Sequence, residues 1–419
     1  MGIRPILSAL RRHKAGTLLI ALQIGLTLAI VCNALFIIGG RIAKIERPSG
    51  LDERDLLFVS TSHAGLKADT PAGRAALAAG IQGDLTALRH LPDVQDAYET
   101  NALSLSNINW TLGLKLSPDA RGGAPGAFFF ADDHTLATLG LKLVAGRDFK
   151  ASEIGRHSLL GTLEPPVVII TKHMADSLFP KGDALGKQVY FVGGATKPST
   201  IIGIVQRMQT GNSQSERDSF TWNSILIPMH MLEPARYYVV RAKPGRLDAA
   251  LHSVPAALYA QDPLRVIPDG TGADAGVRSF AQIRAQAYRG DIAMAQLMGV
   301  ISVILLAVTA AGIVGLSSFW VGQRRKQIGV RRALGATRGD ILSYFLTENL
   351  LISMGGVLLG VALVIGLNLW MVTRFEMAHL PVPYVLVGAV VLLLLGQGAV
   401  LAPALRASRV PPVEATRSV

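Results

Sequence analysis

Four long runs without a charged residue divide the chain, at 15–40, 292–323, 349–373 and 380–405. Each run is longer than the roughly 20 residues that a helix needs to cross a hydrocarbon core about 30 Å thick. The pattern therefore predicts four membrane-spanning helices. The run at 292–323 would make about 48 Å of helix, so it is expected to continue past the membrane as a stalk.

The segment between the first and second runs has the pattern of a soluble α+β domain. Mixed charges, Gly and Pro turns, and short apolar or alternating runs replace the long apolar blocks there. Strands are expected at 56–60, 93–98, 167–170, 188–192, 201–205, 225–228, 237–241 and 264–268, and helices at 74–91, 174–178 and 247–259. A segment of this length can bury a core and leaves room for two lobes.

Residues 3–14 place apolar and basic side chains on different faces of a helix, which predicts a helix lying in the membrane interface. The expected divisions are an interfacial helix at 1–16, transmembrane helix 1 at 17–40, an extracytoplasmic domain at 41–288, transmembrane helix 2 with its stalk at 289–321, a basic loop at 322–341, transmembrane helix 3 at 342–373, a short outer loop at 374–380, transmembrane helix 4 at 381–403 and a tail at 404–419.

The formal net charge of +12 lies almost entirely beside the ends of the apolar runs. Residues 1–16, 322–344 and 403–419 carry the excess of Lys and Arg. Under the positive-inside rule these segments are cytoplasmic, so both termini are expected inside and 41–290 outside. Because topology already explains the basic residues, membrane lipid is an expected partner and nucleic acid is not.

Candidate chemistry is sparse. Cys32 is the only cysteine and lies within the first run, so a buried structural thiol is expected. Asp132, Asp133 and His134 form the cluster closest to a metal site, but they lack a second ligand group at a recognisable spacing. A solvated loop, without metal, is expected there. No stretch matches a Walker A motif, so the chain by itself is not expected to be an enzyme.

Two polar residues stand out within the spans. An ionisable group such as Glu348 is costly in a membrane and is therefore a functional candidate. Its closeness to Asp340 and the interface favours a structural hydrogen-bonding role, and both interpretations stay open. Gln397 is similar but uncharged. Gly356 and Gly360 form a small-xxx-small pair suited to close helix packing, with dimerisation through the pair left open.

The stretch with the strongest signal is 322–343, which combines basic residues with an apolar set at Ile328, Val330 and Leu334. Gly329 and Gly335 permit turns there. A topology signal needs only a few basic residues, whereas this combination suits docking into a groove on another protein.

The run Arg-Lys-Gln-Ile-Gly-Val-Arg-Arg-Ala-Leu-Gly-Ala-Thr at 325–337 resembles the hallmark loop between spans 2 and 3 of the MacB/FtsX superfamily of ABC transporter permeases. The resemblance covers essentially the whole chain, through 140–149, 167–171, 178–180, 185–187, 202–205 and the tail at 403–415. It implies four transmembrane helices and a two-lobed α+β domain, with a Porter-like lobe at 45–100 and 230–285 and a Sabre-like insert at 101–229.

The resemblance implies the permease subunit of a bacterial inner-membrane ABC transporter, with a large periplasmic domain. Such a subunit works by mechanotransmission and drives efflux of a periplasmic substrate such as an antibiotic or peptide. Expected partners are an ABC ATPase subunit, which would bind ATP and Mg²⁺, a second permease copy or paralogue, a periplasmic adaptor and an outer-membrane channel. This chain would bind no cofactor directly. Signalling to a periplasmic cell-wall hydrolase and lipoprotein extraction stay as alternatives.

The resemblance also implies which residues couple to the ATPase. They are Arg324, Arg325, Lys326, Gln327, Ile328, Gly329, Arg331, Arg332, Leu334, Gly335 and Ala336. Gln327 departs from the family, which usually has an acidic residue at this position. The departure implies either an altered interface or a paired permease that supplies the acid.

Overall fold

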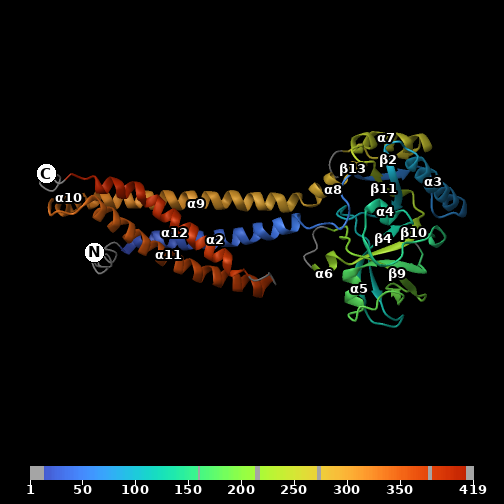
Figure 1. Ribbon diagram of the computed structural model, residues 1–419, viewed down its shortest axis with the longest axis horizontal. Coiled ribbons are helices and arrows are strands. Elements are labelled where there is room, and N and C mark those ends of the chain that lie inside the picture. Colours follow the sequence, from blue (N-terminus) through green and yellow to red (C-terminus); the bar gives the residue numbers. More distant parts are fainter. Residues whose placement is uncertain (1–13, 159–160, 213–217, 271–274, 376–379, 412–419) are drawn as a thin grey trace. The chain divides into compact units, whose positions relative to one another are not determined.

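A computed structural model describes residues 14–158, 161–212, 218–270, 275–375 and 380–411 (Figure 1). The chain divides into a helical unit within Met1–Glu46 and Gly290–Val419, and a soluble unit, Arg47–Arg289. The expected interfacial helix at 1–16 lies almost entirely outside the described residues, as do most of the loop at 374–380 and the end of the tail at 404–419.

Four helices of the helical unit are long and apolar enough to cross a membrane, as predicted. They are α2 (Lys14–Ile45), α9 (Arg289–Gln323), α11 (Arg338–Phe375) and α12 (Val382–Ser408). Helices α2 and α11 extend beyond the expected 17–40 and 342–373. Helix α12 continues five residues into the segment expected as a tail. A short helix, α10 (Arg325–Ala333), occupies the segment expected to be a loop.

Helices α2, α11 and α12 pack side by side around an apolar core (Figure 1). Helix α2 contributes the buried side chains Ile20, Ile24, Leu28 and Cys32, which recur at every fourth position and so lie on one face. Cys32 is fully buried, which confirms the expected structural thiol.

Gly356 and Gly360 of α11 pack directly against α2. A Cβ atom on Gly356 would lie 2.8 Å from Cβ of Ile24, and one on Gly360 would lie 3.0 Å from the carbonyl oxygen of Gly25. Only glycine allows the two backbones to approach this closely. The packing interpretation of the pair is therefore confirmed, and the pair is occupied within the chain rather than free for a second copy.

The first lobe of the soluble unit is a five-stranded sheet covered by helices. Its strands are β1 (Leu56–His63), β2 (Val94–Thr100), β11 (Ala235–Ala242), β12 (Arg265–Val266) and β13 (Val277–Ser279), in the order β12-β1-β11-β2 with β13 also on β1. Helices α3 (Pro71–Arg89) and α7 (Leu247–Gln261) bury Leu85 and Leu258 against Leu57, Val59 and Tyr238 of the sheet. Helix α8 (Phe280–Ala287) follows β13.

The second lobe is inserted between β2 and β11. Its strands are β3 (Thr111–Lys115), β4 (Ala124–Ala131), β5 (Leu143–Gly146), β6 (Gly155–His157), β7 (Val167–Thr171), β8 (Gln188–Phe191), β9 (Ser199–Val205) and β10 (Ser224–Met231). They follow the order β4-β3-β8-β9-β7-β10-β6, with β5 on β9. Because β10 also pairs with β4, the sheet closes into a ring around an apolar core.

Short helices complete this lobe: α4 (Thr135–Leu139), η1 (Ala151–Glu153), α5 (Lys172–Leu178) and α6 (Asp218–Thr221). The two-lobed α+β domain was predicted, although the expected division at 229 falls inside β10. Strands β3 to β6 and β13 were not expected. The strand expected at 264–268 is only two residues long.

Candidate functional site

The candidate site is the segment from the end of α9 through α10. Arg324 separates the two helices, yet its backbone NH donates to the carbonyl of Trp320 at 3.0 Å, and Ile328 NH donates to the carbonyl of Arg324 at 2.9 Å. These are the i to i−4 bonds of an α-helix. A single residue with non-helical dihedral angles, Arg324, therefore separates α9 from α10.

Helix α10 buries one part of its predicted apolar set and exposes the other. Ile328 is only 4% exposed and packs into the core of the helical unit. Val330 is 47% exposed and Leu334 83%. Ile328 and Gly329, which the resemblance places among the ATPase-coupling residues, are both buried within this chain. Gly329 also makes no turn, because it lies inside α10.

The basic residues of α10 are divided in the same way. Arg331 stacks over the ring of Tyr344 at 4.9 Å, and Nη1 of Arg332 donates to the carbonyl of Ser408 at 3.0 Å. These contacts hold α10 against α11 and α12. Arg325, Lys326 and Gln327 are exposed. The exposed face of α10 therefore combines apolar side chains with cations.

Gly335 makes the turn that ends α10, as predicted. Its φ of +98° lies in the left-handed region, which glycine adopts without strain. The NH of half-buried Ala336 returns to the carbonyl of Arg331 at 3.0 Å, which satisfies a carbonyl at the helix end. Thr337 and Asp340 then bond reciprocally at the start of α11.

Glu348 pairs with Arg324 rather than facing solvent or lipid. Nη1 of Arg324 lies 3.0 Å from Oε1 and 2.9 Å from Oε2, and Glu348 is 3% exposed. Arg324 was expected at the docking surface, but its side chain is directed to α11. Gln397 is half-buried in α12, and its Nε2 has no hydrogen-bond partner among the described residues. No signal in the sequence joined Arg324 to Glu348.

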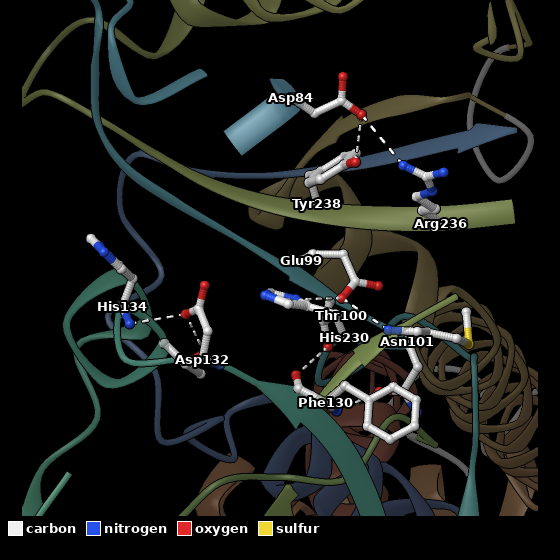
Figure 2. Close-up of polar contacts among 12 residues, drawn as sticks. Asp84, Glu99, Thr100, Asn101, Phe130, Asp132, His134, His230, Arg236 and Tyr238 are labelled. Carbon is white, nitrogen blue, oxygen red and sulfur yellow. Dashed lines mark hydrogen bonds and ion pairs between the residues drawn. The ribbon is translucent and has the colours of Figure 1, made fainter. Parts of the chain in front are cut away.

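Buried polar side chains also join the two lobes of the soluble unit (Figure 2). Thr100 and Asn101, at the end of β2, bond to the backbone of Phe130 in β4 at 2.9 and 2.7 Å. Glu99 lies 3.1 Å from Nδ1 of His230 in β10, and burial raises the pKa of this carboxyl although His230 opposes the shift. The end of one sheet is thereby fixed to the other.

Asp132 corrects the expectation of a solvated loop at 132–134. It is 3% exposed, lies 3.1 Å from Nη2 of Arg89, and accepts from the NH of His134 at 2.9 Å (Figure 2). Burial raises the pKa of this carboxyl, while Arg89 opposes the shift. Among the residues that the structure describes, no group of three or more His, Cys, Asp or Glu could hold a metal ion.

Two protein families match this chain. Residues 19–256 match the MacB-like periplasmic core domain, and residues 299–412 match the FtsX-like permease C-terminal region. The first match covers the soluble unit up to α7, and the second covers the candidate site.

Individual relatives from the same group of permeases align with part of the chain. The chain is 27% identical over 280 residues to the macrolide export ATP-binding/permease protein MacB of Chromobacterium violaceum. The aligned residues make up 66% of this chain and 41% of that protein. The chain is 26% identical over 225 residues to the uncharacterized ABC transporter permease YknZ of Bacillus subtilis, covering 53% and 52%. The chain thus spans about half or less of the length of these relatives.

Among solved structures, the periplasmic region of MacB from Actinobacillus actinomycetemcomitans is 14% identical, with a TM-score of 0.34, and covers 57% of this chain and 95% of that one. The extracellular domain of the noncanonic ABC-type transporter YknZ from Gram-positive bacteria aligns at 13% identity and a TM-score of 0.31, covering 49% and 95%.

Proposed function

Because this chain belongs to the family that joins a MacB-like periplasmic core domain to an FtsX-like permease region, we propose that it transmits the energy of ATP hydrolysis across a membrane to its soluble domain. The family assignment confirms the resemblance predicted from residues 325–337. The chain is a membrane protein of the ABC permease family.

The exposed face of α10 is the observation that carries this proposal. Val330 and Leu334 expose two apolar side chains beside exposed cations, and we infer that another protein covers this surface. Since only Arg324 separates α10 from α9, we expect a partner that displaces α10 to move the long helix with it. ATP and Mg²⁺ would bind to that partner, an ABC ATPase.

The proposed output is efflux of a periplasmic substrate. The name of the MacB relative supports export. Some buried polar groups of the spans bond to one another, since Thr27 bonds to Thr309 at 2.7 Å and Asn349 to the carbonyl of Gly396 at 3.0 Å, whereas Nε2 of Gln397 has no partner among the described residues. The proposal places substrate handling in the soluble unit, with a second permease copy or paralogue, an adaptor and an outer-membrane channel as partners.

Replacing Leu334 with Asp tests the docking surface. A carboxylate buried without a partner costs several kcal/mol, so recovery of the ATPase with the affinity-tagged chain should fall by about tenfold or more. Membrane insertion should not change. Leu116→Asp is the matched control, because it places the same charge at an exposed leucine of the soluble unit, where co-purification should persist.

Undiminished co-purification of the ATPase with Leu334→Asp would contradict the docking proposal. The proteins recovered with the unmodified chain from native membranes also test the output. An adaptor and a channel support efflux, whereas a cell-wall hydrolase recovered without them contradicts it.

A further inference from the structure

Helix α9 buries several polar side chains and exposes many apolar ones, unlike a helix on the surface of a soluble protein. Its buried residues include Asp291, Ser302, Thr309 and Ser317, whereas apolar side chains such as Val303 are exposed. Helix α12, in contrast, buries mainly apolar and small residues. Ile313 and Trp320 are also buried, in the core of the helical unit, so α9 is held by apolar packing together with polar contacts.

These contacts are spaced along the whole length of α9. They are Asp291 with Arg41 at 2.6 Å and Lys44 at 3.5 Å, Val308 carbonyl with Gln23 at 3.1 Å, Thr309 with Thr27 at 2.7 Å, and Arg324, just beyond its end, with Glu348. Point contacts of this kind hold a helix in one position without the continuous interdigitation that close apolar packing gives.

The pair at Arg324 is the most deeply enclosed contact at the α10 end. The side chains of Arg324 and Glu348 are 12% and 4% exposed. Glu348 also lines a small cavity with Trp320, Phe345 and Val400, so the surroundings are largely apolar. Electrostatic attraction is stronger in such surroundings than in water, and removing one partner leaves the other charge buried and unpaired.

Glu348 lies on α11, which packs against both α12 and α2. The next residue, Asn349, bonds to the carbonyl of Gly396 in α12, and further along α11 the glycines 356 and 360 contact α2. Arg324, in contrast, lies between α9 and α10. The ion pair thus connects the junction of these two helices to α11, which packs with α2 and α12.

We propose that the Arg324–Glu348 ion pair is a positioning contact that fixes the resting position of α9 and α10 against α11. The proposal rests on the proposed function, in which α10 receives the movement of the ATPase. Displacement of α10 then has to shift or break this pair before α9 moves. Arg324 acts through Glu348 and does not itself belong to the docking surface.

Nitroxide distance measurements on the full chain in lipid nanodiscs test this role. Cys32→Ala removes the only cysteine, and labels are attached at Gln327→Cys on α10 and Leu358→Cys on α11, both exposed. Leu358 lies ten residues beyond Glu348, about 15 Å along the helix, which separates the labels enough to measure. The parent pair should give one narrow distance distribution.

In Arg324→Gln and in Glu348→Gln, the distance distribution should become broad. The double exchange Arg324→Glu with Glu348→Arg should make it narrow again. Lys326→Gln, which removes an exposed cation two residues away, is the matched control and should leave the distribution unchanged. A purely local packing role for either residue would not be rescued by exchanging the charges.

The proposal would be overturned if both single variants gave distance distributions as narrow as that of the parent. It would also be overturned if the double exchange gave a distribution as broad as those of the single variants. Because these measurements use no ATPase, they stand even if Leu334→Asp retains its partner. With the ATPase bound, and with the label of Gln327 moved to exposed Phe319→Cys on α9, outside the docking surface, ATP and vanadate should shift the distance in the parent. An unchanged parent distance would overturn the link between this pair and ATP-driven movement.

Discussion

At the scale of single residues, burial and ion pairing shift the pKa values of two carboxyl groups of the soluble unit in opposite directions. Burial raises the pKa of Asp148 to about 6, and the nearby Asp133 and Asp132 add to the shift. Arg147 holds the pKa of Glu153 at about 2. Between pH 4 and 7 Asp148 therefore changes its charge while Glu153 does not.

Asp148→Asn should raise the stability of the soluble unit at neutral pH. The native carboxyl is neutral at low pH, where its contribution to folding is complete, and that contribution is lost as the pH rises through about 6. Asn stays neutral and retains an oxygen to accept from the NH of Phe149. The gain at pH 7.5 should be about 1 kcal/mol, or 2–4 °C in Tm, allowing for partial exposure.

Thermal unfolding of the full chain in detergent, followed from pH 4 to 8, measures this effect. The difference between Asp148→Asn and the parent should grow as the pH rises through 6. Asp119→Asn, at an exposed aspartate, should show no such growth. A constant difference across the pH range would argue that the charge of Asp148 is not the cause.

At the scale of elements, the contact between α11 and α2 depends on the side to which each glycine faces. Gly355 and Gly356 are neighbours in α11, but only Gly356 faces α2, and a Cβ atom on Gly355 would meet no atom within 4 Å. The pair offers an internal control, because both substitutions change helix propensity equally.

Gly356→Leu should separate α11 from α2 and destabilise the helical unit, whereas Gly355→Leu should be tolerated. Overpacking at such a contact costs roughly 1–3 kcal/mol or more, because the obstructing atoms include the carbonyl oxygen of Ala21. The yield of monodisperse protein after mild heating in detergent measures the difference. Equal yields from the two variants would contradict the observed packing of α11.

The sequence was sufficient for elements whose signal is local. Uncharged runs predicted the four long helices, and Gly335 predicted the turn after α10. Strands β3 to β6 escaped notice because they are short, or, like β4, buried without alternation, so that their pairing depends on distant strands. The sequence around α10 is compatible with a helix, but Gly329 permits a turn as well, so the sequence alone does not decide between the two.

The polar contacts of the candidate site could not be predicted for the same reason. Arg324 and Glu348 are 24 residues apart, and nothing in their spacing shows that two helices bring them together. Without the partner, a basic stretch predicts a uniformly exposed surface. The structure instead uses Arg324 and Arg332 for internal contacts and leaves Val330 and Leu334 exposed.

At the scale of the whole molecule, the placement of charge predicts which side of the membrane each segment faces. Apolar helices with basic residues at one end insert with that end in the cytoplasm, so α10 should lie inside and the soluble unit outside. An input at α10 and an output in the soluble unit require this arrangement, because ATP is available only in the cytoplasm.

Cysteine labelling of whole cells tests the arrangement. In a Cys32→Ala background, Leu116→Cys should react with a membrane-impermeant maleimide as soon as the outer barrier is opened, whereas Gln327→Cys should react only after the inner membrane is permeabilised. The parent, whose sole cysteine is fully buried, should stay unlabelled in both conditions. Labelling of Gln327→Cys in cells with an intact inner membrane would place the docking surface outside, and an ATPase could then not drive α9.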